Sequence, residues 1–369
     1  MKYIKLKDVC KINMGQSPDS SSYNESGEGI PFFQGNADFG DRYPVTRIWC
    51  SEPKKVAQEN DILISVRAPI GAINYSKEKC CIGRGLAALT VDKTKISEKL
   101  LFWVLKAKKE ELNRQGTGST FKAISKKSLE ELLIPQIDIK EQEKDVEILE
   151  KIYMIIQNKH KELKLLTDLI SARFVEMFGD PIRNTQNRPT TKLINVVKMQ
   201  RGFDLPVQDR NQDGNIPVYG ANGVLDSHNT ARIHGGGVIT GRSGTIGKVF
   251  YTEGDYWPLN TSLFSVDKHG NNVIYLAYLL QMFDLTRFVE GTGVPTLNRN
   301  MFHNRQIIDV PINEQNQFAA FVHQINKSKF VIHKFLYCFI DNKQSIIKPR
   351  LNTKESGKIR GGKPHADEF

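Results

Sequence analysis

One stretch of the sequence carries the residue types of a phosphate-binding loop. Residues 241–248 read Gly-Arg-Ser-Gly-Thr-Ile-Gly-Lys, in which glycines would expose backbone N–H groups to an anion and the lysine would add charge. The pattern Gly-x-x-x-x-Gly-Lys-Ser/Thr fails twice. Arg242 stands where the first glycine is needed, and Val249 replaces the hydroxyl residue that binds magnesium. The sequence therefore argues against a nucleotide site here.

Other catalytic and metal-binding patterns are missing from the sequence. It contains no His-Glu-x-x-His, no Gly-x-Ser-x-Gly, no Gly-x-Gly-x-x-Gly that opens a helix after a strand, and no Asn-Pro-Pro-Phe or Asp-Pro-Pro-Tyr of an amino-methyltransferase. The five cysteines form no Cys-x-x-Cys pair, so packing within strands is favoured over zinc binding: Cys10, Cys50, Cys80, Cys81 and Cys338. We expect no catalytic residues and no metal ligands.

What does recur is a set of scaffold residues. A Gly-Thr-Gly segment occurs at 116–118 and again at 291–293, about 175 residues further along. One arginine recurs in a turn-rich setting, as Arg67 and Arg242, and a lone glycine recurs as Gly15 and Gly202. Further segments match in the same order: 5–9 with 192–196, 29–33 with 215–219, 61–71 with 237–247, 101–105 with 276–280, 134–135 with 310–311, and 141–142 with 314–315.

This order indicates a duplicated domain, and 369 residues fit two domains. A duplicated enzyme should duplicate its acid, base or ligand set. Glycines, prolines, apolar anchors and one arginine are repeated instead, which favours a binding protein.

The charge of the chain points to the kind of partner. A net charge of +11 and a pI of about 9.2 favour a polyanion, with nucleic acid first, although a generally basic composition without such a partner is the alternative. No run of 18 apolar residues occurs, and the N-terminus lacks an apolar signal region, so we expect a cytoplasmic protein without a membrane span.

The elements that must position these residues alternate along the chain. Short apolar or β-branched stretches bounded by Gly or Pro predict strands at 61–64, 80–89 and 237–240. Polar stretches at 16–29 and 204–215 predict loops, and helices are expected near 99–112 and 273–289.

Each copy ends in a long helical pattern. Apolar residues spaced alternately three and four apart run from Leu149 to Met177 and stop at the helix-ending Gly179-Asp180-Pro181. A second such pattern runs from Phe318 to Ile346, where a register through Val322, Ile325, Lys329, Ile332, Leu336 and Phe339 fits equally well. Polar residues in the seams either fix the register or lie at a solvated edge: Lys159, Arg173, Ser328 and Asn342.

These features resemble the specificity subunit of type I restriction-modification systems over residues 1–350. The resemblance rests on the ordered set of segments, present twice, and on the helix end Phe174-Val175-Glu176-Met177-Phe178-Gly179-Asp180-Pro181. It implies an α+β fold with two tandem target recognition domains of mixed α/β structure, each followed by a long helix. The two helices would pack as an antiparallel coiled coil with pseudo-two-fold symmetry. The implied segments are recognition domains at 1–136 and 181–311, spacer helices at 137–180 and 312–350, and a disordered basic tail at 351–369.

The resemblance also implies the function and the partners. The chain would read a bipartite, asymmetric sequence in double-stranded DNA without catalysing a reaction, and the helices would measure the unread gap. It would recruit two methyltransferase (M) subunits and, through the complex, restriction (R) subunits. S-adenosylmethionine, ATP and magnesium are expected on those partners, with no cofactor on this chain.

Candidate DNA contacts are suggested by the repeated turns and the diverging loops. Arg67 and Arg242 either touch DNA or form structural salt bridges. Residues on or beside the Gly-Thr-Gly turns either approach phosphates or serve the turn itself: Thr117, Ser119, Thr120, Lys122, Thr292, Thr296 and Asn298. Base contacts are expected from loop residues that differ between the copies: Asn36, Arg42, Arg84, Asn222, Asn229 and Arg232.

The apolar seam positions are the candidates for partner binding: Ile156, Leu163, Leu166, Ile170, Phe174, Phe178, Ile325, Ile332, Phe335 and Phe339. Two rival hypotheses stay open on the sequence. One is a self-contained nuclease or methyltransferase, and the other is a free-standing bipartite DNA-binding regulator that needs no enzyme partner.

Overall fold

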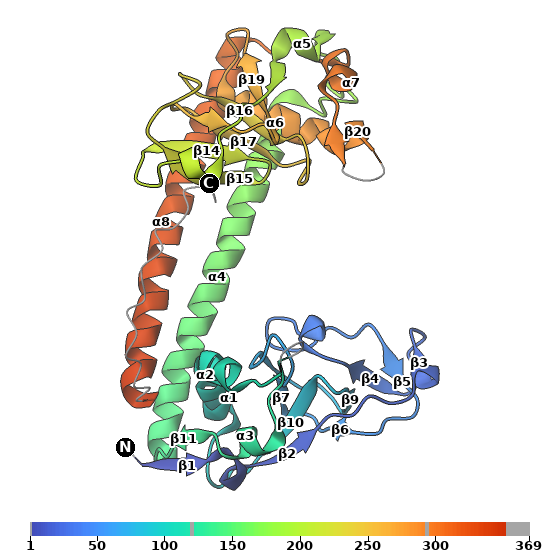
Figure 1. The fold of residues 1–369 in the computed structure, drawn as a ribbon, viewed down its shortest axis with the longest axis vertical. Helices are drawn as coiled ribbons and strands as arrows, with labels where there is room; N and C mark the ends of the chain where they lie inside the picture. Colours follow the sequence, from blue (N-terminus) through green and yellow to red (C-terminus); the bar gives the residue numbers. More distant parts are fainter. Residues whose placement is uncertain (1, 119–121, 292–294, 352–369) are drawn as a thin grey trace. The chain divides into compact units, whose positions relative to one another are not determined.

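The computed structural model describes residues 2–118, 122–291 and 295–351 (Figure 1). The chain divides into two compact units. Unit 1 is built on residues up to Gln157 together with helical residues from Cys338, and unit 2 is built on residues Asn158–Tyr337. The prediction of two tandem domains of mixed α/β structure is therefore confirmed. The division between the units falls inside the long helices, so each unit contains part of both.

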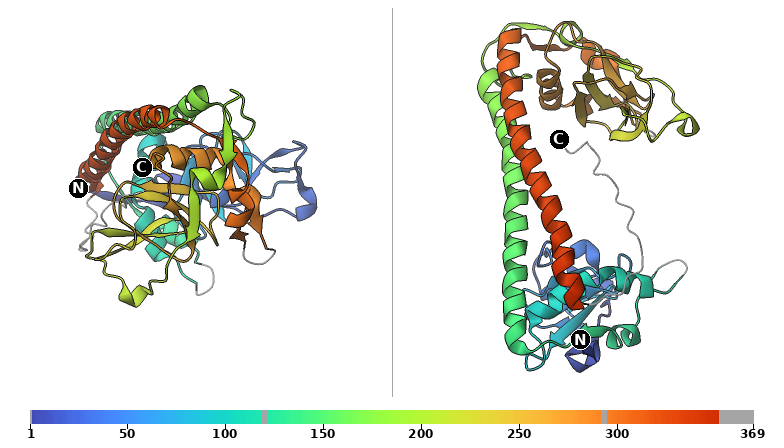
Figure 2. Two further views of the ribbon diagram at one scale, coloured as in Figure 1. Left: turned by 90° about the horizontal axis from the view of Figure 1, so that it is seen from above. Right: turned by 90° about the vertical axis from the view of Figure 1, so that its left-hand side faces the viewer.

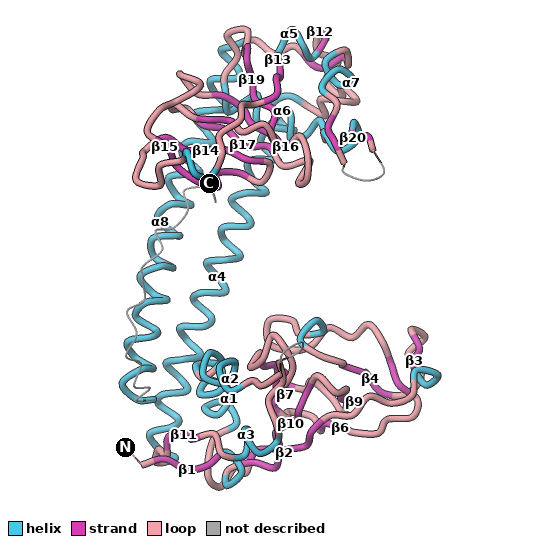
Figure 3. Tube along the Cα trace, in the orientation of Figure 1, coloured by secondary structure: helices cyan, strands magenta, loops and turns pink. Residues whose placement is uncertain are grey.

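The central element of unit 1 is a four-stranded antiparallel sheet (Figure 3). Its strands, in spatial order, are β2 (Cys10–Met14), β10 (Leu86–Val91), β7 (Ile62–Ser65) and β8 (Ile73–Tyr75). Successive side chains of a strand point to opposite faces. Ile62 and Ile64 accordingly pack into a large core with helix α1 (Glu98–Ala107), whereas Leu63 packs into a smaller core on the other face.

The smaller core of unit 1 lies under a second, five-stranded sheet. In spatial order its strands are β3 (Tyr23–Asn24), β5 (Trp49–Cys50), β4 (Ile30–Phe33), β9 (Cys80–Ile82) and β6 (Val56–Ala57). Only the β4–β9 pair among these is parallel. A separate antiparallel pair joins β1 (Tyr3–Lys5) to β11 (Leu133–Pro135), so the start of the domain is tied to its end.

Unit 2 repeats the topology of the main sheet and of the pair that ties the start of the domain to its end, whereas its second sheet is smaller. Its main sheet has the order β13 (Lys198–Arg201), β19 (Ser262–Asp267), β16 (Gly237–Gly241) and β17 (Val249–Thr252). The second sheet has three strands, β15 (Gly223–His228), β14 (Ile216–Gly220) and β18 (Trp257–Pro258), and β14–β18 is again the parallel pair. β12 (Thr190–Lys192) pairs with β22 (Gln306–Ile308), and α6 (Val273–Phe283) takes the place of α1.

The repeated glycines occupy corresponding positions in the two units. Gly15 comes directly after β2, and a Cβ atom there would lie 2.1 Å from the carbonyl oxygen of Gly83. Gly202 comes directly after β13, and its Cβ would lie 2.2 Å from the carbonyl oxygen of Leu259. Neither glycine has a positive φ, so close backbone approach, rather than a left-handed turn, explains why glycine stands at both places.

The two long helices are α4 (Ile139–Phe178) and α8 (Ile312–Leu351). α4 ends where the Gly-Asp-Pro sequence predicts, because Gly179 adopts a φ of +74° and its N–H donates to the carbonyl of Val175. Within unit 2 the end of α4 lies beside the start of α8 (Figure 2), and the rings of Phe174 and Phe318 lie 5.4 Å apart.

The burial pattern of α8 selects one of the two registers. Val322, Ile325, Lys329, Ile332 and Leu336 are all buried, whereas Ser328 and Phe335 of the other register are exposed. On α4, Lys159 pairs with Glu162 and Arg173 with Glu176, both within hydrogen-bond distance. These polar seam residues therefore lie at solvated edges.

Several predicted elements are shorter than expected. The predicted strand 80–89 is split into β9 and β10 at Gly83–Gly85, and the helix predicted near 99–112 is interrupted at Lys108. The helix predicted near 273–289 ends at Phe283, because Asp284 has a φ of +53°. The remaining short elements are α2 (Lys109–Gln115), α3 (Lys126–Glu130), α5 (Leu193–Val196), α7 (Arg299–His303), β20 (Val289–Glu290), β21 (Thr296–Leu297) and the 3-10 turns η1 (Leu6–Asp8), η2 (Ser20–Ser22), η3 (Asn36–Asp38), η4 (Val207–Asp209) and η5 (Leu285–Phe288).

The described cysteines are buried, which agrees with the packing role that the sequence favours: Cys10, Cys50, Cys80 and Cys81. Burial raises the pKa of the Cys10 thiol to about 12. Within the described residues, no group of three His, Cys, Asp or Glu side chains is placed to hold a metal ion. No helix of the described chain combines the length and apolar character needed to span a membrane.

Candidate nucleic-acid interface

In unit 1 the recurring arginine lies beside the first Gly-Thr-Gly segment. Arg67 comes two residues after β7, and its neighbours are held by backbone hydrogen bonds: Ile124 donates to Val66 and Ala68 donates to Lys122. Thr117 exchanges two further backbone bonds of 2.9 Å with Ala123. The side chains of Arg67, Thr117 and Lys122 are all exposed. The fold thus brings the cationic residues Arg67 and Lys122 and the hydroxyl residue Thr117 onto neighbouring, hydrogen-bonded segments.

The backbone pairing of the arginine turn recurs in unit 2. Arg242 comes directly after β16, which corresponds to β7, and its carbonyl accepts a 2.7 Å hydrogen bond from the N–H of Leu297. Ser243 forms a β-bridge with Thr296. The Nε of Arg242 donates to the carbonyl of Asn260, which orients the guanidinium and leaves its other N–H groups for a ligand.

These contacts bear on the two roles left open for the arginines. Among the described residues, neither Arg67 nor Arg242 forms an ion pair with a carboxylate, so the salt-bridge alternative gains no support. A guanidinium without an acidic partner, held beside exposed backbone, is suited to bind a phosphate or the edge of a guanine.

The backbone after Lys248 differs from that of a nucleotide-binding phosphate loop. Gly244 and Gly247 have positive φ, but the chain then enters strand β17 and not a helix. The N-terminal helix dipole and N–H groups that a nucleotide loop uses are therefore missing at this place. Lys248 instead donates to the side chain of Asn222 over 2.9 Å, so both residues support the loop.

Arg42 is placed differently from a base-reading residue. Its Nη2 contacts both carboxylate oxygens of Glu150 on α4, at 2.6 and 2.7 Å, and its guanidinium lies 4.6 Å from the ring centre of Tyr153. Trp103 donates to the same carboxylate, and Tyr153 donates to Asp41. These contacts hold the guanidinium against α4 and give Arg42 a structural role, so the structure lends no support to its predicted contact with a base. We call this group of Asp41, Arg42, Trp103, Glu150 and Tyr153 the Arg42 clamp.

The other residues predicted to contact DNA differ in whether their side chains already bind neighbours within the chain. Asn298 caps α7 and donates to Glu290, so its amide serves the local fold. Arg232 is exposed and stacks over Phe203 at 4.5 Å. Arg84 and Asn229 are exposed, and Asn36 is half-buried. Ser119, Thr120 and Thr292 lie outside the described residues, as do residues 352–369 of the predicted tail.

Three of the predicted partner-binding residues belong to the protein's own core. Ile170, Phe174 and Phe178 are completely buried, and both phenylalanines contact Tyr275 of α6. Their assignment to a partner surface is therefore wrong, because the seam of α4 faces its own domain there. Ile156, Ile325 and Ile332 are buried, Leu163 and Leu166 are half-buried, Phe335 is exposed, and the side chain of Phe339 is not among those described.

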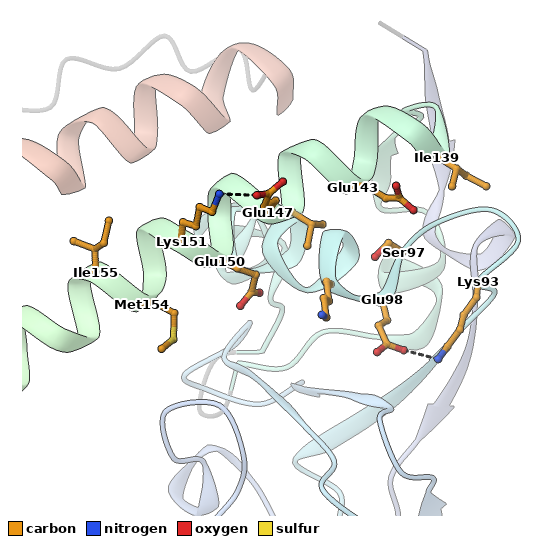
Figure 4. A pocket seen from close by; sticks show the side chains of 12 residues that line it. Lys93, Ser97, Glu98, Ile139, Glu143, Glu147, Glu150, Lys151, Met154 and Ile155 are labelled. Atoms are coloured by element: carbon orange, nitrogen blue, oxygen red, sulfur yellow. Dashed lines mark hydrogen bonds and ion pairs between the residues drawn. The ribbon is translucent and has the colours of Figure 1, made fainter.

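Apolar side chains that the seam analysis missed are exposed on the outer faces of the helices. On α4 they are Ile139, Ile148, Met154, Ile155, Leu165, Leu169 and Val175. In unit 1 a groove of about 990 Å³ runs along α4 beside the start of α1 (Figure 4). Val146, Met154 and Ile155 give it an apolar floor, and the pairs Glu147–Lys151 and Glu98–Lys93 lie along it. An open surface of this kind suits a protein segment. In the sequence, these exposed residues form a second apolar stripe on α4 beside the predicted seam, and that stripe could have indicated the surface.

Comparison with known proteins agrees with this arrangement. The family model described as "Type I restriction modification DNA specificity domain" matches residues 1–167 and 189–349. The putative type I restriction enzyme MjaX specificity subunit of Methanocaldococcus jannaschii is 47% identical over 152 residues, which are 41% of this chain and 36% of that protein. The MjaIX specificity subunit of the same organism is 25% identical over 195 residues, covering 49% of this chain and 45% of that protein.

Both alignments cover less than half of the relative's length. The crystal structure of the S subunit of a type I restriction-modification system from M. genitalium covers 95% of both chains, with a TM-score of 0.60 and 15% identity, so that the likeness concerns the fold. Because the family model matches most of each half of the sequence, this chain belongs to the type I restriction modification DNA specificity domain family.

Proposed function

We propose that this chain is the DNA-recognition subunit of a type I restriction-modification complex and catalyses no reaction itself. The observation that carries the proposal is the repeated site: each unit presents an arginine just after a corresponding strand, beside residues that follow a Gly-Thr-Gly sequence, Lys122 to Ile124 in unit 1 and Thr296 and Leu297 in unit 2. A site that occurs twice, on domains whose main sheets share one topology, suits a target with two halves. The excess of 52 Lys and Arg over 41 Asp and Glu favours a polyanionic ligand.

The target should be bipartite and asymmetric. The second sheets of the two units differ, with five strands in unit 1 and three in unit 2, and the loops they carry differ with them. Phosphate contacts from the repeated turns would position each unit, and base contacts from the differing loops would specify the sequence. Arg84, Asn229 and Arg232 remain the exposed candidates for base contacts.

The long helices would serve two purposes in this proposal. Packed as an antiparallel coiled coil, they would hold the two recognition units at a fixed separation and with pseudo-two-fold symmetry. Their exposed apolar residues, together with the groove of unit 1, would receive two methyltransferase subunits, and restriction subunits would join through the complex. Those partners would bring S-adenosylmethionine, ATP and magnesium.

The experiment is to sequence the methylome of a host that co-expresses this chain with the methyltransferase encoded beside it. We expect N6-methyladenine in both halves of one split, asymmetric sequence, and loss of that mark when this chain is deleted. Substitution of Arg67 should lower methylation without moving the target. A soluble, folded pair that adds no methylation would contradict the proposal and favour a free-standing regulator.

A further inference from the structure

A buried glutamine joins the start of α4 to its domain in unit 1. Gln142 ends the first turn of α4 and is 1% exposed. Its Oε1 accepts a 2.7 Å hydrogen bond from the N–H of Ser97, the residue that caps α1. Its Nε2 donates to the carbonyl of Ile137 at 2.8 Å and to that of Lys95 at 3.4 Å. One amide thus connects the long helix, the segment that leads into it and the start of the domain helix.

Unit 2 contains the same connection at the corresponding place. Gln315 is also 1% exposed, and its Oε1 accepts a 2.9 Å bond from the N–H of Asn272, which caps α6. Its Nε2 donates to the carbonyl of Val310 at 2.8 Å and to the side chain of Asn271 at 2.6 Å. In both units the side-chain amide makes the same two hydrogen bonds. It accepts one from the N–H of the residue that caps the domain helix, and it donates one to the carbonyl of the residue five positions before the glutamine.

From this repetition we infer that Gln142 and Gln315 are positioning residues, which fix the angle between each recognition domain and its long helix and thereby set the gap between the two DNA half-sites. The inference rests on the proposed function. Neither glutamine is exposed, so neither contacts DNA. Each would act through the direction in which its helix leaves the domain.

The chemistry of the amide explains why glutamine stands at these positions. The side chain must accept from one backbone N–H and donate to carbonyl oxygens at the same time, and an amide offers both functions without charge. A methionine of similar length would leave the N–H of the capping residue buried and unpaired. A glutamate could accept but would place its charge against carbonyl oxygens.

The geometry also explains why a local bond would affect a distant spacing. A helix of the 40 residues of α4 is about 60 Å long at 1.5 Å per residue. A tilt of about 10° at one end would therefore displace the other by roughly 10 Å, which is about three base pairs at 3.4 Å each. Even a small loosening at the glutamine would broaden the set of gaps that the protein accepts.

The test measures gap preference with the complete chain in complex with its methyltransferase. DNA substrates carry both half-sites, with the natural gap or with the gap changed by one or two base pairs, and methylation of each half is measured. We expect the wild-type complex to methylate a substrate whose gap is changed by one base pair at least about tenfold less than the substrate with the natural gap. This factor is the size of effect expected from the loss of one base contact. In Gln142→Met and Gln315→Met this preference should fall below about threefold.

Controls separate a positioning role from a folding role. Gln324→Met, an exposed change on the same helix as Gln315, should keep the wild-type preference. Ser97→Pro removes the N–H that Gln142 accepts from while leaving the glutamine in place, and Ser97 already has a φ of −66° that proline can adopt. Ser97→Pro should therefore broaden the accepted gap as Gln142→Met does.

The outcomes separate this inference from the proposed function. A wild-type complex that methylates no split target would contradict the proposed function, whatever the variants do. Full gap preference in folded Gln142→Met and Gln315→Met complexes would overturn the positioning role alone. If thermal unfolding shows that neither these variants nor Ser97→Pro fold, the glutamines are folding determinants and the positioning role is again overturned.

Discussion

The Arg42 clamp gives a quantitative prediction about what attaches the loop around Arg42 to α4. In Glu150→Gln the shape of the side chain is retained, and Trp103 keeps an oxygen to which it can donate, but the charge opposite Arg42 is lost. Removing one partner of a fully buried ion pair costs about 3–5 kcal/mol. The side chains of Arg42 and Glu150 are 24% and 23% exposed, so water remains nearby and we expect a smaller cost, about 2 kcal/mol.

The assay is denaturant unfolding of the complete chain, monitored by tryptophan fluorescence, because Trp103 lies in the clamp. A double-mutant cycle with Arg42→Met isolates the interaction between the two charges, and its coupling energy should be about 1–2 kcal/mol. Glu147→Gln is the matched control on the same helix. Its ion pair with Lys151 is 65% and 70% exposed, and its loss should cost less than about 0.5 kcal/mol.

The pH dependence of the clamp provides an independent check. Burial would raise the pKa of Glu150, but hydrogen bonds from Arg42 and Trp103 outweigh it and hold the pKa below its ordinary value. A carboxylate with a lowered pKa in the folded state contributes stability above its unfolded pKa of about 4.3. That contribution is lost as the pH falls through the folded pKa, so the difference between wild type and Glu150→Gln should shrink there. Additive effects of Arg42→Met and Glu150→Gln, within about 0.5 kcal/mol, would refute the reasoning.

Three further predictions concern other parts of the chain. His303 accepts from the N–H of Met199 through Nε2, and burial, together with the smaller effect of the charges of Arg299 and Lys198, lowers its pKa. The stability of unit 2 should therefore fall as the pH drops below about 6.5. Thermal unfolding measured across this pH range should show a weaker pH dependence in His303→Gln, and an unchanged pH dependence would contradict this role of His303. Gly15→Ala and Gly202→Ala should each destabilise their own unit by about 2 kcal/mol or more in denaturant unfolding, since each Cβ would strike a carbonyl oxygen; a cost under about 0.5 kcal/mol would mean that the strands separate easily. If Arg67 and Arg242 contact phosphates, Arg67→Ala and Arg242→Ala should each reduce the slope of log binding constant against log salt concentration by about 1. Titration of the complex with target DNA at several salt concentrations measures this slope. An unchanged slope with an altered sequence preference would instead indicate contacts with bases.

The parts of the fold that sequence could predict are those fixed by local patterns. The repeated Gly-Thr-Gly segments and the shared order of glycines and prolines are local, and they led to the duplicated topology that the two units show. The end of α4 at Gly179 was predictable because the signal lies within three residues. The closeness of Arg67 to Thr117 and Lys122 could be anticipated, because the segment around Arg67 and the Gly-Thr-Gly segment both recur in the second half of the sequence.

The parts that escaped prediction depend on long-range pairing. Arg42 and Glu150 are 108 residues apart, and nothing near Arg42 in the sequence marks it as an ion-pair partner. Periodicity identified the apolar face of α4 but not what covers it, so Phe174 and Phe178 were assigned to a partner when Tyr275 of the same chain packs on them. The choice between the two registers of α8 depended on which of its residues are buried in the folded chain, and Lys329 is one of them.

The four-stranded sheet of each unit acts as a partition between two cores that can change independently. Neighbouring residues face opposite sides: Ile62 and Leu63 in unit 1, and Val238 and Ile239 in unit 2. On the helix side both units have kept one long helix, one domain helix and the connecting glutamine. On the other side one unit has built five strands and the other three. Loops on that side can therefore change without repacking of the helix side. Under the proposed function, this would let the recognised sequence diverge while the supporting architecture stays constant.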